Sequence, residues 1–274
     1  GEISLVGSYS QIGHRTVTSG GISNADLTLR ARSFDRLSGD SGSGLFHVDA
    51  GLGTMMSSSL ATGHVSLLAT GSEGLWLGEN IRQNSAFALN LLSTGNLYLT
   101  GHAVNQGSGA VNLVAGWDPS VSSLSGGAPT VPDAGGIPRQ YLVRDIDMDT
   151  EIFGVAGSYG ANGGSVWVGA SPTLAAADRA VMVASRTGQT NVAGSSVHVW
   201  GSALTGGAGV GERRFSQIGY NRREGATTVA LAATGRIRVG AINDIEVISN
   251  KYAVGLLGSG GWPGNDHSGF ASYA

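Results

Sequence analysis

The densest group of ionisable side chains in the sequence lies in the stretch DIDMDTE, residues 145–151. In an extended chain every second side chain points to the same side, so four carboxylates would share one face. Hard oxygen ligands suit Ca²⁺, whereas the glycine and the twelve-residue spacing of an EF-hand loop are missing. A solvated acidic face that pairs with nearby arginines is therefore the alternative. The candidate metal ligands are Asp145, Asp147, Asp149 and Glu151.

A second chemical possibility is the loop GDSGSGLF, residues 39–46, which resembles the nucleophile loop of serine-protease autotransporters. In such a loop Ser41 would attack a carbonyl while backbone amides bind the oxyanion. The mechanism also needs a general-base His and an orienting Asp well upstream, and His14 is the only histidine before Ser41. The composition favours a turn of small residues here. A protease passenger with Ser41 as the nucleophile stays an alternative.

Large aromatic side chains are a third feature, because several fall at outward positions of predicted strands. Exposed aromatic rings stack on sugars or seat protein partners, and the alternative is packing against the rest of the chain. The candidate binding surface consists of Trp76, Tyr98, Trp167 and Trp200. The six histidines are scattered without the spacing of a metal site. We therefore expect no catalytic residues and no cofactor, with Ca²⁺ as the one open possibility.

The composition limits the classes of protein to which the chain can belong. Charged residues make up 13% of the 274 residues, hydrophobic residues make up 41%, and 46 residues are glycine. Such a chain is too apolar to be disordered, and a net charge of -3 gives no support for nucleic-acid binding. The sequence has no cysteine, which excludes disulfides and agrees with export in an unfolded state. No apolar run is long enough to span a membrane, and the first residues, GEISLVGSYS, do not form a signal peptide.

The elements that must position these side chains are visible in a repeat over residues 64–117. One phrase recurs with its first apolar residue at Val65, Leu89 and Val111, in steps of 24 and 22 residues. Each phrase contains two short alternating strands, and a Thr-Gly corner follows the first strand in the first two. A single phrase cannot bury its apolar face, whereas stacked copies can, which is the physics of a solenoid. The phrase returns at residues 228–240, with its corner at Thr234-Gly235.

The asymmetry of this repeat favours parallel stacking over an antiparallel meander. A meander has no reason to keep two unequal strands in register, and Asn-Gly and Asp-Gly hairpin turns are missing from the repeats. We expect the Thr-Gly corners to align. The expected inward positions are Val65, Leu67, Leu75, Leu77, Leu89, Leu91, Leu97, Leu99, Val111 and Leu113. The expected outward positions include Ser66, Trp76, Asn90, Asn96, Tyr98 and Asn112.

The sequence divides into two runs of coils around a break. Residues 118–140 contain Pro119, Pro129, Pro132 and Pro138, together with Ser and Gly clusters, and proline removes a ladder donor. We predict coils over residues 1–117, an excursion over 118–140, and further coils of the same solenoid over 141–274. More strands are expected at residues 45–48, 140–143, 165–168, 180–183, 196–200, 246–249 and 253–257.

Two phrases connect the chain to a known family. The phrase GAVNLVAGWD, residues 109–118, and the phrase SYSQIGH, residues 8–14, with echoes near residues 217 and 273, resemble recurrent phrases of filamentous-haemagglutinin-like exoproteins. The resemblance covers most of residues 1–117 and 214–274. It implies a right-handed parallel β-helix that is exported through an outer-membrane transporter and is secreted or displayed on the bacterial surface. It also implies that the protein is an adhesin with a role in virulence.

Together these observations predict an all-β protein and an adhesive function. We expect a non-catalytic rod that mediates attachment or presents a distal effector, with a host-cell or matrix receptor, a glycan or another copy of itself as the partner. A self-assembling extracellular fibre is the first alternative, because the ends of stacked coils are free strand edges. A polysaccharide-cleaving β-helix that uses the acidic stretch is the remaining enzymatic alternative beside the protease.

Overall fold

The computed structural model of the chain describes residues 2–4, 27–31, 33–35, 45–48, 65–69, 71–78, 81–118, 146–172, 181–201, 214–220, 234–248 and 253–257. Nineteen strands are described, together with a π-helical turn at Met148–Ile152 and a 3₁₀ turn at Ala161–Gly163. The expected all-β class is therefore confirmed for this part of the chain. The Ser41 loop, Asp145, the expected strand at 140–143 and most of the excursion at 118–140 lie outside the described residues.

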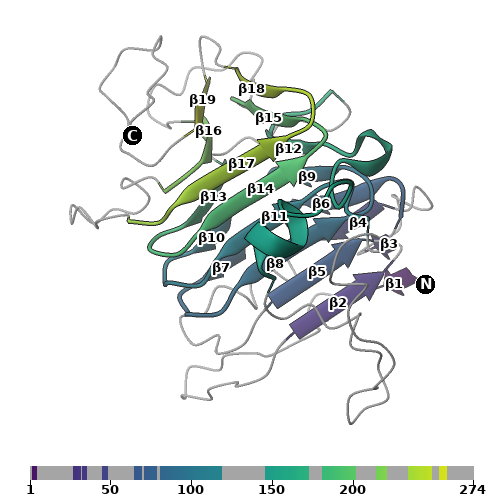
Figure 1. Ribbon diagram of the computed structural model, residues 1–274, viewed down its shortest axis with the longest axis horizontal. Coiled ribbons are helices and arrows are strands. Elements are labelled where there is room, and N and C mark those ends of the chain that lie inside the picture. The colour runs from purple at the N-terminus through teal and green to yellow at the C-terminus, as the bar shows by residue number, and fades with distance from the viewer. Residues whose placement is uncertain are drawn as a thin grey trace.

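The strands form three sheets in which all described pairings are parallel (Figure 1). The six-stranded sheet contains β2 (Leu27–Ala31), β5 (Val65–Ala69), β8 (Leu89–Ser93), β11 (Val111–Val114), β14 (Thr190–Gly194) and β17 (Ile237–Ala241). The eight-stranded sheet contains β1 (Glu2–Ser4), β3 (Ser33–Asp35), β4 (Leu45–Val48), β6 (Gly74–Leu77), β9 (Leu97–Leu99), β12 (Val166–Gly169), β15 (Val197–Trp200) and β18 (Ile245–Ile248). The five-stranded sheet contains β7 (Ile81–Gln83), β10 (Ala103–Asn105), β13 (Val181–Ser185), β16 (Arg214–Ile218) and β19 (Ala253–Leu257).

From β5 onward the chain visits the three sheets in one constant order. A strand of the six-stranded sheet is followed by one of the eight-stranded sheet and then by one of the five-stranded sheet, and this order recurs five times up to β19. Each strand consequently pairs with the equivalent strand of a neighbouring round, and the strands inside a sheet pair on both sides. The register predicted from the repeat is confirmed, because Val65 is the Cα partner of Leu89 and Leu89 is the partner of Val111.

One hydrophobic cluster joins the inward sides of all three sheets. It contains every one of the ten predicted inward residues, all of them buried, and residues of the five-stranded sheet such as Ile81, Val183 and Ile218. Period-two alternation therefore identified this side of the strands correctly. Burial of each Leu or Ile side chain contributes roughly 2 kcal/mol relative to exposure, so the shared cluster is the main attraction between the sheets.

The Thr-Gly corners align between rounds, as predicted. The Thr94 hydroxyl donates to the carbonyl of Gly71 at 3.2 Å, and the Gly116 amide donates to the carbonyl of Gly95 at 2.9 Å. Glycine is required for two different reasons. Gly116 has a φ of 58°, which other residues resist. At Gly95 the reason is space, because a Cβ would overlap the carbonyl of Ser72.

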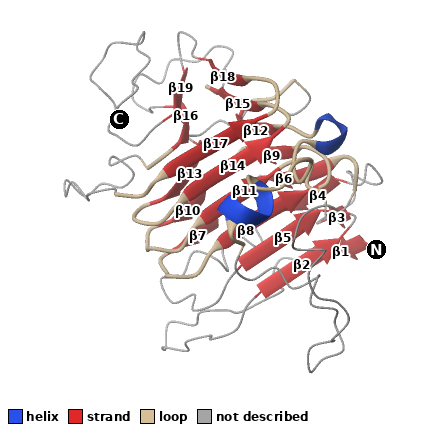
Figure 2. Cartoon of the chain, in the orientation of Figure 1, coloured by secondary structure: helices blue, strands red, loops and turns tan. Residues whose placement is uncertain are grey.

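The outward side of the six-stranded sheet is buried, contrary to expectation. Ser66, Asn90 and Asn112 were expected to face outward, yet at most 1% of each is exposed. Residues 146–160, which we call the cover segment, lie over this face, and its π-helical turn is the blue helix in front of the sheet in Figure 2. A second cluster formed by sheet residues and the cover segment contains Leu68, Leu92, Val114, Trp117, Ala193, Ile146, Met148 and Ile152. The alternation predicted the side correctly but not the cover.

The later phrase at residues 228–240 contains a strand after its Thr234-Gly235 corner. This strand is β17, and it lies in the six-stranded sheet, where Ile237 is the Cα partner of Thr190.

Strand pairing in the described residues stops at Val114 and resumes at Val166. The connection from β11 to β12 therefore carries the cover segment before the chain rejoins the stack. Among the described residues, none lies in a helix with the length and apolar character needed to cross a membrane.

Candidate binding face on the eight-stranded sheet

The structure brings three of the four predicted surface aromatics into one column. Trp76 of β6 is the Cα partner of Tyr98 of β9, and Tyr98 is the partner of Trp167 of β12. His198 of β15 follows at the same position, because it is the partner of Trp167. All four side chains are partly exposed. We call these four residues the aromatic column; it runs perpendicular to the strands on the outward side of the eight-stranded sheet.

The column arises because the strands share one alternation. In β6, β9, β12 and β15 the residues on either side of the ring are leucine or valine and belong to the buried cluster. Successive residues of a strand point to opposite faces, so the residue between two buried ones must point outward. Parallel pairing without a register shift then places one outward ring above the next.

Two rings of the aromatic column are held in place by hydrogen bonds. The indole N–H of Trp76 donates to Oγ1 of Thr100 at 2.8 Å. The Tyr98 hydroxyl accepts from the side-chain amide of Asn96 at 2.9 Å, and the same amide's oxygen accepts from the backbone N–H of Ser165 at 2.9 Å. These contacts orient both rings before any ligand arrives, which lowers the entropic cost of binding.

The other two rings are held by stacking. Trp167 and His198 lie face to face, with centroids 3.6 Å apart and an angle of 12° between their planes. Trp200, the fourth predicted aromatic, lies at the next outward position of β15 and contacts the edge of Trp167 at 4.9 Å between centroids. Its Cα partner is Gly169, so no side chain competes with the indole at that position of β12. All four predicted aromatics thus belong to one face.

The column ends at an acidic residue. Glu246 of β18 is the Cα partner of His198, and its carboxylate lies 2.8 Å from Nδ1 of the imidazole. The Glu246 side chain is 44% exposed and that of His198 is 12% exposed. His198 was not among the residues predicted to form the binding surface. The signal was present in the phrase VHVW, whose alternation matches the outward position of Tyr98 in LYL.

The charge on this face is low and negative. The described strands of the eight-stranded sheet contain no Lys or Arg. The acidic residues next to the aromatic column are Asp244 and Glu246. A face with these properties suits a ligand that offers C–H groups and hydroxyls better than one that offers phosphate, sulfate or carboxylate.

The acidic stretch is helical rather than extended over its described residues 148–152. Met148–Ile152 is a π-helical turn with Asp147 as its N-cap. Oδ1 of Asp147 accepts from the backbone N–H groups of Asp149 and Thr150, at 3.0 and 3.4 Å. A carboxylate oxygen of Glu151 accepts from the Asp147 N–H at 3.0 Å, which completes a reciprocal cap. The expectation of four carboxylates on one extended face was therefore wrong for this segment.

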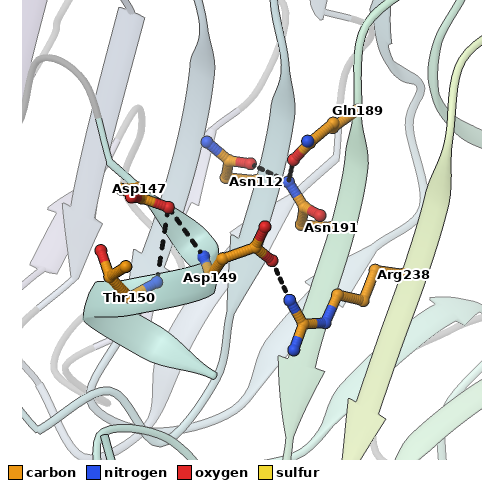
Figure 3. A network of polar contacts seen from close by, with 7 residues as sticks. All are labelled: Asn112, Asp147, Asp149, Thr150, Gln189, Asn191 and Arg238. Atoms are coloured by element: carbon orange, nitrogen blue, oxygen red, sulfur yellow. Dashed lines mark hydrogen bonds and ion pairs between the residues drawn. The ribbon is translucent and has the colours of Figure 1, made fainter. Parts of the chain in front are cut away.

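The third carboxylate of the stretch points elsewhere. Asp149 pairs with Arg238 of β17 (Figure 3). The Arg238 guanidinium also lies 4.0 Å above the ring of Phe153. Helical geometry thus turns Asp147 and Asp149 toward different partners. No group of three or more His, Cys, Asp or Glu side chains that could hold a metal ion occurs among the residues described. Asp145, the remaining candidate ligand, lies outside them.

On the face of the six-stranded sheet that packs against the cover segment, the buried polar residues form what we call the asparagine ladder. Asn90 donates to Oγ of Ser66 at 3.0 Å, Asn112 donates to Oδ1 of Asn90 at 2.9 Å, and Asn191 donates to Oδ1 of Asn112 at 2.8 Å. Figure 3 shows the last of these bonds close to Arg238, which is the Cα partner of Asn191. This ladder satisfies buried amides and holds the register of successive rounds.

The histidines of the described residues make separate contacts and do not cluster with one another. His102 is 6% exposed, and its Nδ1 accepts from the backbone N–H of Met182 at 2.9 Å. Among the described residues the geometry offers a candidate aromatic binding face, and it offers no group of side chains that could hold a metal ion. No protein-family model, curated protein or solved structure matches this chain in sequence or structure comparisons.

Proposed function

We propose that the chain is a segment of a right-handed parallel β-helix that serves as an adhesive rod on a secreted or surface-displayed bacterial exoprotein. Three observations support the β-helix. The chain visits three parallel sheets in a constant order, the rounds stay in register across the long β11–β12 connection, and one hydrophobic cluster joins all three sheets. Each complete round would be one coil of a solenoid.

The observation that carries the adhesive function is the aromatic column on the eight-stranded sheet. Its four rings are in register on adjacent strands and are oriented by hydrogen bonds and stacking. Aromatic side chains that are partly exposed and rigid are typical anchors of binding surfaces. A rod also repeats its coils at a fixed spacing, so it presents such anchors in a straight row.

Export through an outer-membrane transporter belongs to the same proposal. The phrases at residues 8–14 and 109–118 resemble exoproteins of that secretion class, and a chain without cysteine can cross a membrane unfolded without forming wrong disulfides. On this view the activity is attachment, and no catalytic residue is required.

The test of the adhesive function compares wild type with a variant that lacks the column. We would measure binding of fluorescently labelled protein to epithelial monolayers and to plates coated with collagen, fibronectin or laminin. We expect saturable binding to at least one surface, at least tenfold weaker for the triple variant Trp76→Ala, Tyr98→Ala, Trp167→Ala. Asn84→Ala, at an exposed position between β7 and β8, is the matched control and should bind as wild type. Equal binding by wild type and the triple variant would contradict the proposal.

A second candidate function is a self-assembling fibre, which one observation favours. Ile245 lies in register with the buried Val197, yet it is 47% exposed, and Ile248 on the same strand is 44% exposed. Apolar side chains on an edge strand attract a further strand. Sedimentation velocity at several concentrations decides between the two. Growth of the species with concentration, suppressed by Ile245→Lys, supports a fibre, and a constant monomer contradicts it.

A further inference from the structure

We propose that the aromatic column binds an uncharged polysaccharide, with the sugar chain lying along the column and across the strands. This inference rests on the proposed adhesive function and adds the chemical class of the receptor. It follows from the spacing of the rings, from the groups that surround them and from the charge of the face.

The spacing of the rings suits a sugar chain. Adjacent strands in a sheet lie about 4.8 Å apart, so the four rings of the column, from Trp76 to His198, span about 14 Å. A pyranose unit in an extended polysaccharide advances its chain by a similar length. One sugar unit can therefore meet one ring on each successive strand. A ligand that lay parallel to the strands would meet a single ring of the column.

The chemistry of the rings also suits sugars. The faces of aromatic rings are negative and attract the weakly positive C–H groups of a pyranose, whereas ring edges are positive and attract its hydroxyl oxygens. Trp167 and His198 cover each other's facing sides, so these two rings offer a ligand their edges. The orientation of two rings is fixed by hydrogen bonds: Trp76 donates to Thr100, and Tyr98 accepts from Asn96. The Tyr98 hydroxyl accepts one hydrogen bond there and keeps its own proton to donate to a sugar oxygen.

The charge of the face selects uncharged sugars. Recognition of sulfated or carboxylated glycans relies on Lys and Arg, and the described strands of this sheet have neither. The Glu246 carboxylate at the end of the column, together with Asp244, repels anions instead. Binding should then be almost independent of salt concentration, because no ion pair is screened.

The experiment measures the mobility of the purified protein in native gels that contain hydroxyethylcellulose, laminarin, galactomannan or dextran, with heparin as the anionic polymer. We expect retardation by at least one of the four uncharged polysaccharides and none by heparin. The affinity should change less than twofold between 50 and 500 mM NaCl, and it should rise with oligosaccharide length up to about four units, one for each strand of the column.

Two single variants test the column itself. Trp76→Ala and Tyr98→Ala should each weaken retardation at least fivefold, while Phe87→Ala, a partly exposed aromatic outside the eight-stranded sheet, should leave it unchanged. Circular dichroism confirms that each variant is folded. If both variants unfold, the wild-type results with uncharged polymers, heparin and salt still decide the proposal.

Three outcomes would overturn the inference: no retardation by any of the four uncharged polysaccharides, stronger retardation by heparin than by all of them, or retardation that both folded variants retain. The adhesive function itself is tested separately, by the binding of the triple variant to cells and matrix proteins. If the triple variant loses cell or matrix binding but no uncharged polysaccharide retards the wild-type protein, the column is an adhesive surface whose ligand is not an uncharged polysaccharide. Cell binding that survives loss of the column would refute both.

Discussion

The side-chain amide of Asn191 donates a 2.8 Å hydrogen bond to Oδ1 of Asn112, although 79 residues separate the two asparagines in the sequence. The bond continues the ladder that links Asn112 to Asn90 and Asn90 to Ser66 over separations of only 22 and 24 residues. The long connection between β11 and β12 therefore leaves the register of the six-stranded sheet intact. The rounds on both sides of it behave as one stack.

The asparagine ladder should contribute measurably to stability. Asn112→Ala removes two buried side-chain hydrogen bonds, to Asn90 and from Asn191, and should lower the free energy of unfolding by about 2 kcal/mol. Urea denaturation followed by circular dichroism measures the change. Asn84→Ala, at an exposed position, is the control and should stay within about 0.5 kcal/mol of wild type. Equal stability of the two variants would show that the ladder is not formed.

A substitution at Gly116 tests whether the end of the β11–β12 connection packs closely against the corner after β11. Gly116→Ala adds a Cβ 2.5 Å from the backbone nitrogen of Ala161 at a φ of 58°, so both crowding and backbone strain should destabilise the protein. Gly163→Ala is a matched control, because Gly163 has a φ of 75° but nothing within 4 Å of the added Cβ. The control isolates the strain, about 1 kcal/mol, and Gly116→Ala should cost at least about twice as much in urea unfolding.

The cover segment should protect the outward leucines of the six-stranded sheet. Leu92 is fully buried in the cluster that contains Met148 and Ile152 of the cover segment. Leu92→Ala should therefore cost about 2–4 kcal/mol, as for a core residue, although Leu92 points away from the cluster shared by the three sheets. Ile242→Ala removes a side chain that is 59% exposed and should cost much less. Similar small effects of both changes, in thermal unfolding, would mean that the cover segment does not dock.

The pairing of Asp149 with Arg238 should contribute little to stability. Both side chains are about half exposed, at 53% and 44%, so solvent screens the attraction between them. A double-mutant cycle with Asp149→Asn and Arg238→Gln should give a coupling of about 0.5 kcal/mol that falls as NaCl is raised. A coupling above about 2 kcal/mol, or one that salt does not change, would contradict this assignment. The measurement is urea unfolding of the four proteins.

The proposed adhesive function requires no nucleophile at Ser41. Ser41→Ala should therefore leave binding to cells, to matrix proteins and to polysaccharides at the wild-type level, as measured in the same assays. A protease passenger would instead cleave casein in its wild-type form and lose that activity in the variant. Cleavage that depends on Ser41 would replace the adhesive rod by the enzymatic alternative.

The sequence alone determined which residues lie in register and which side of each strand faces the main core. Val65, Leu89 and Val111 were equated from the repeat and are Cα partners in the structure. This was possible because a strand has a period of two and a stacked repeat keeps its register, so both properties are local to each phrase.

What lies over a sheet was decided only by the tertiary structure. Alternation assigns Asn112 and Tyr98 to the same outward side in the same way, yet Asn112 is 1% exposed on the face that the cover segment packs against, and Tyr98 is partly exposed. The covering residues arrive from a connection whose path no periodicity predicts. The position of Trp167 beside Tyr98 in one column depends on the same connection, because the chain pairs β12 with β9 only after it. The conformation of the acidic stretch was also decided by tertiary contacts. Met148 and Ile152 are buried against the sheet in a helical turn, which the alternation of acidic residues did not predict.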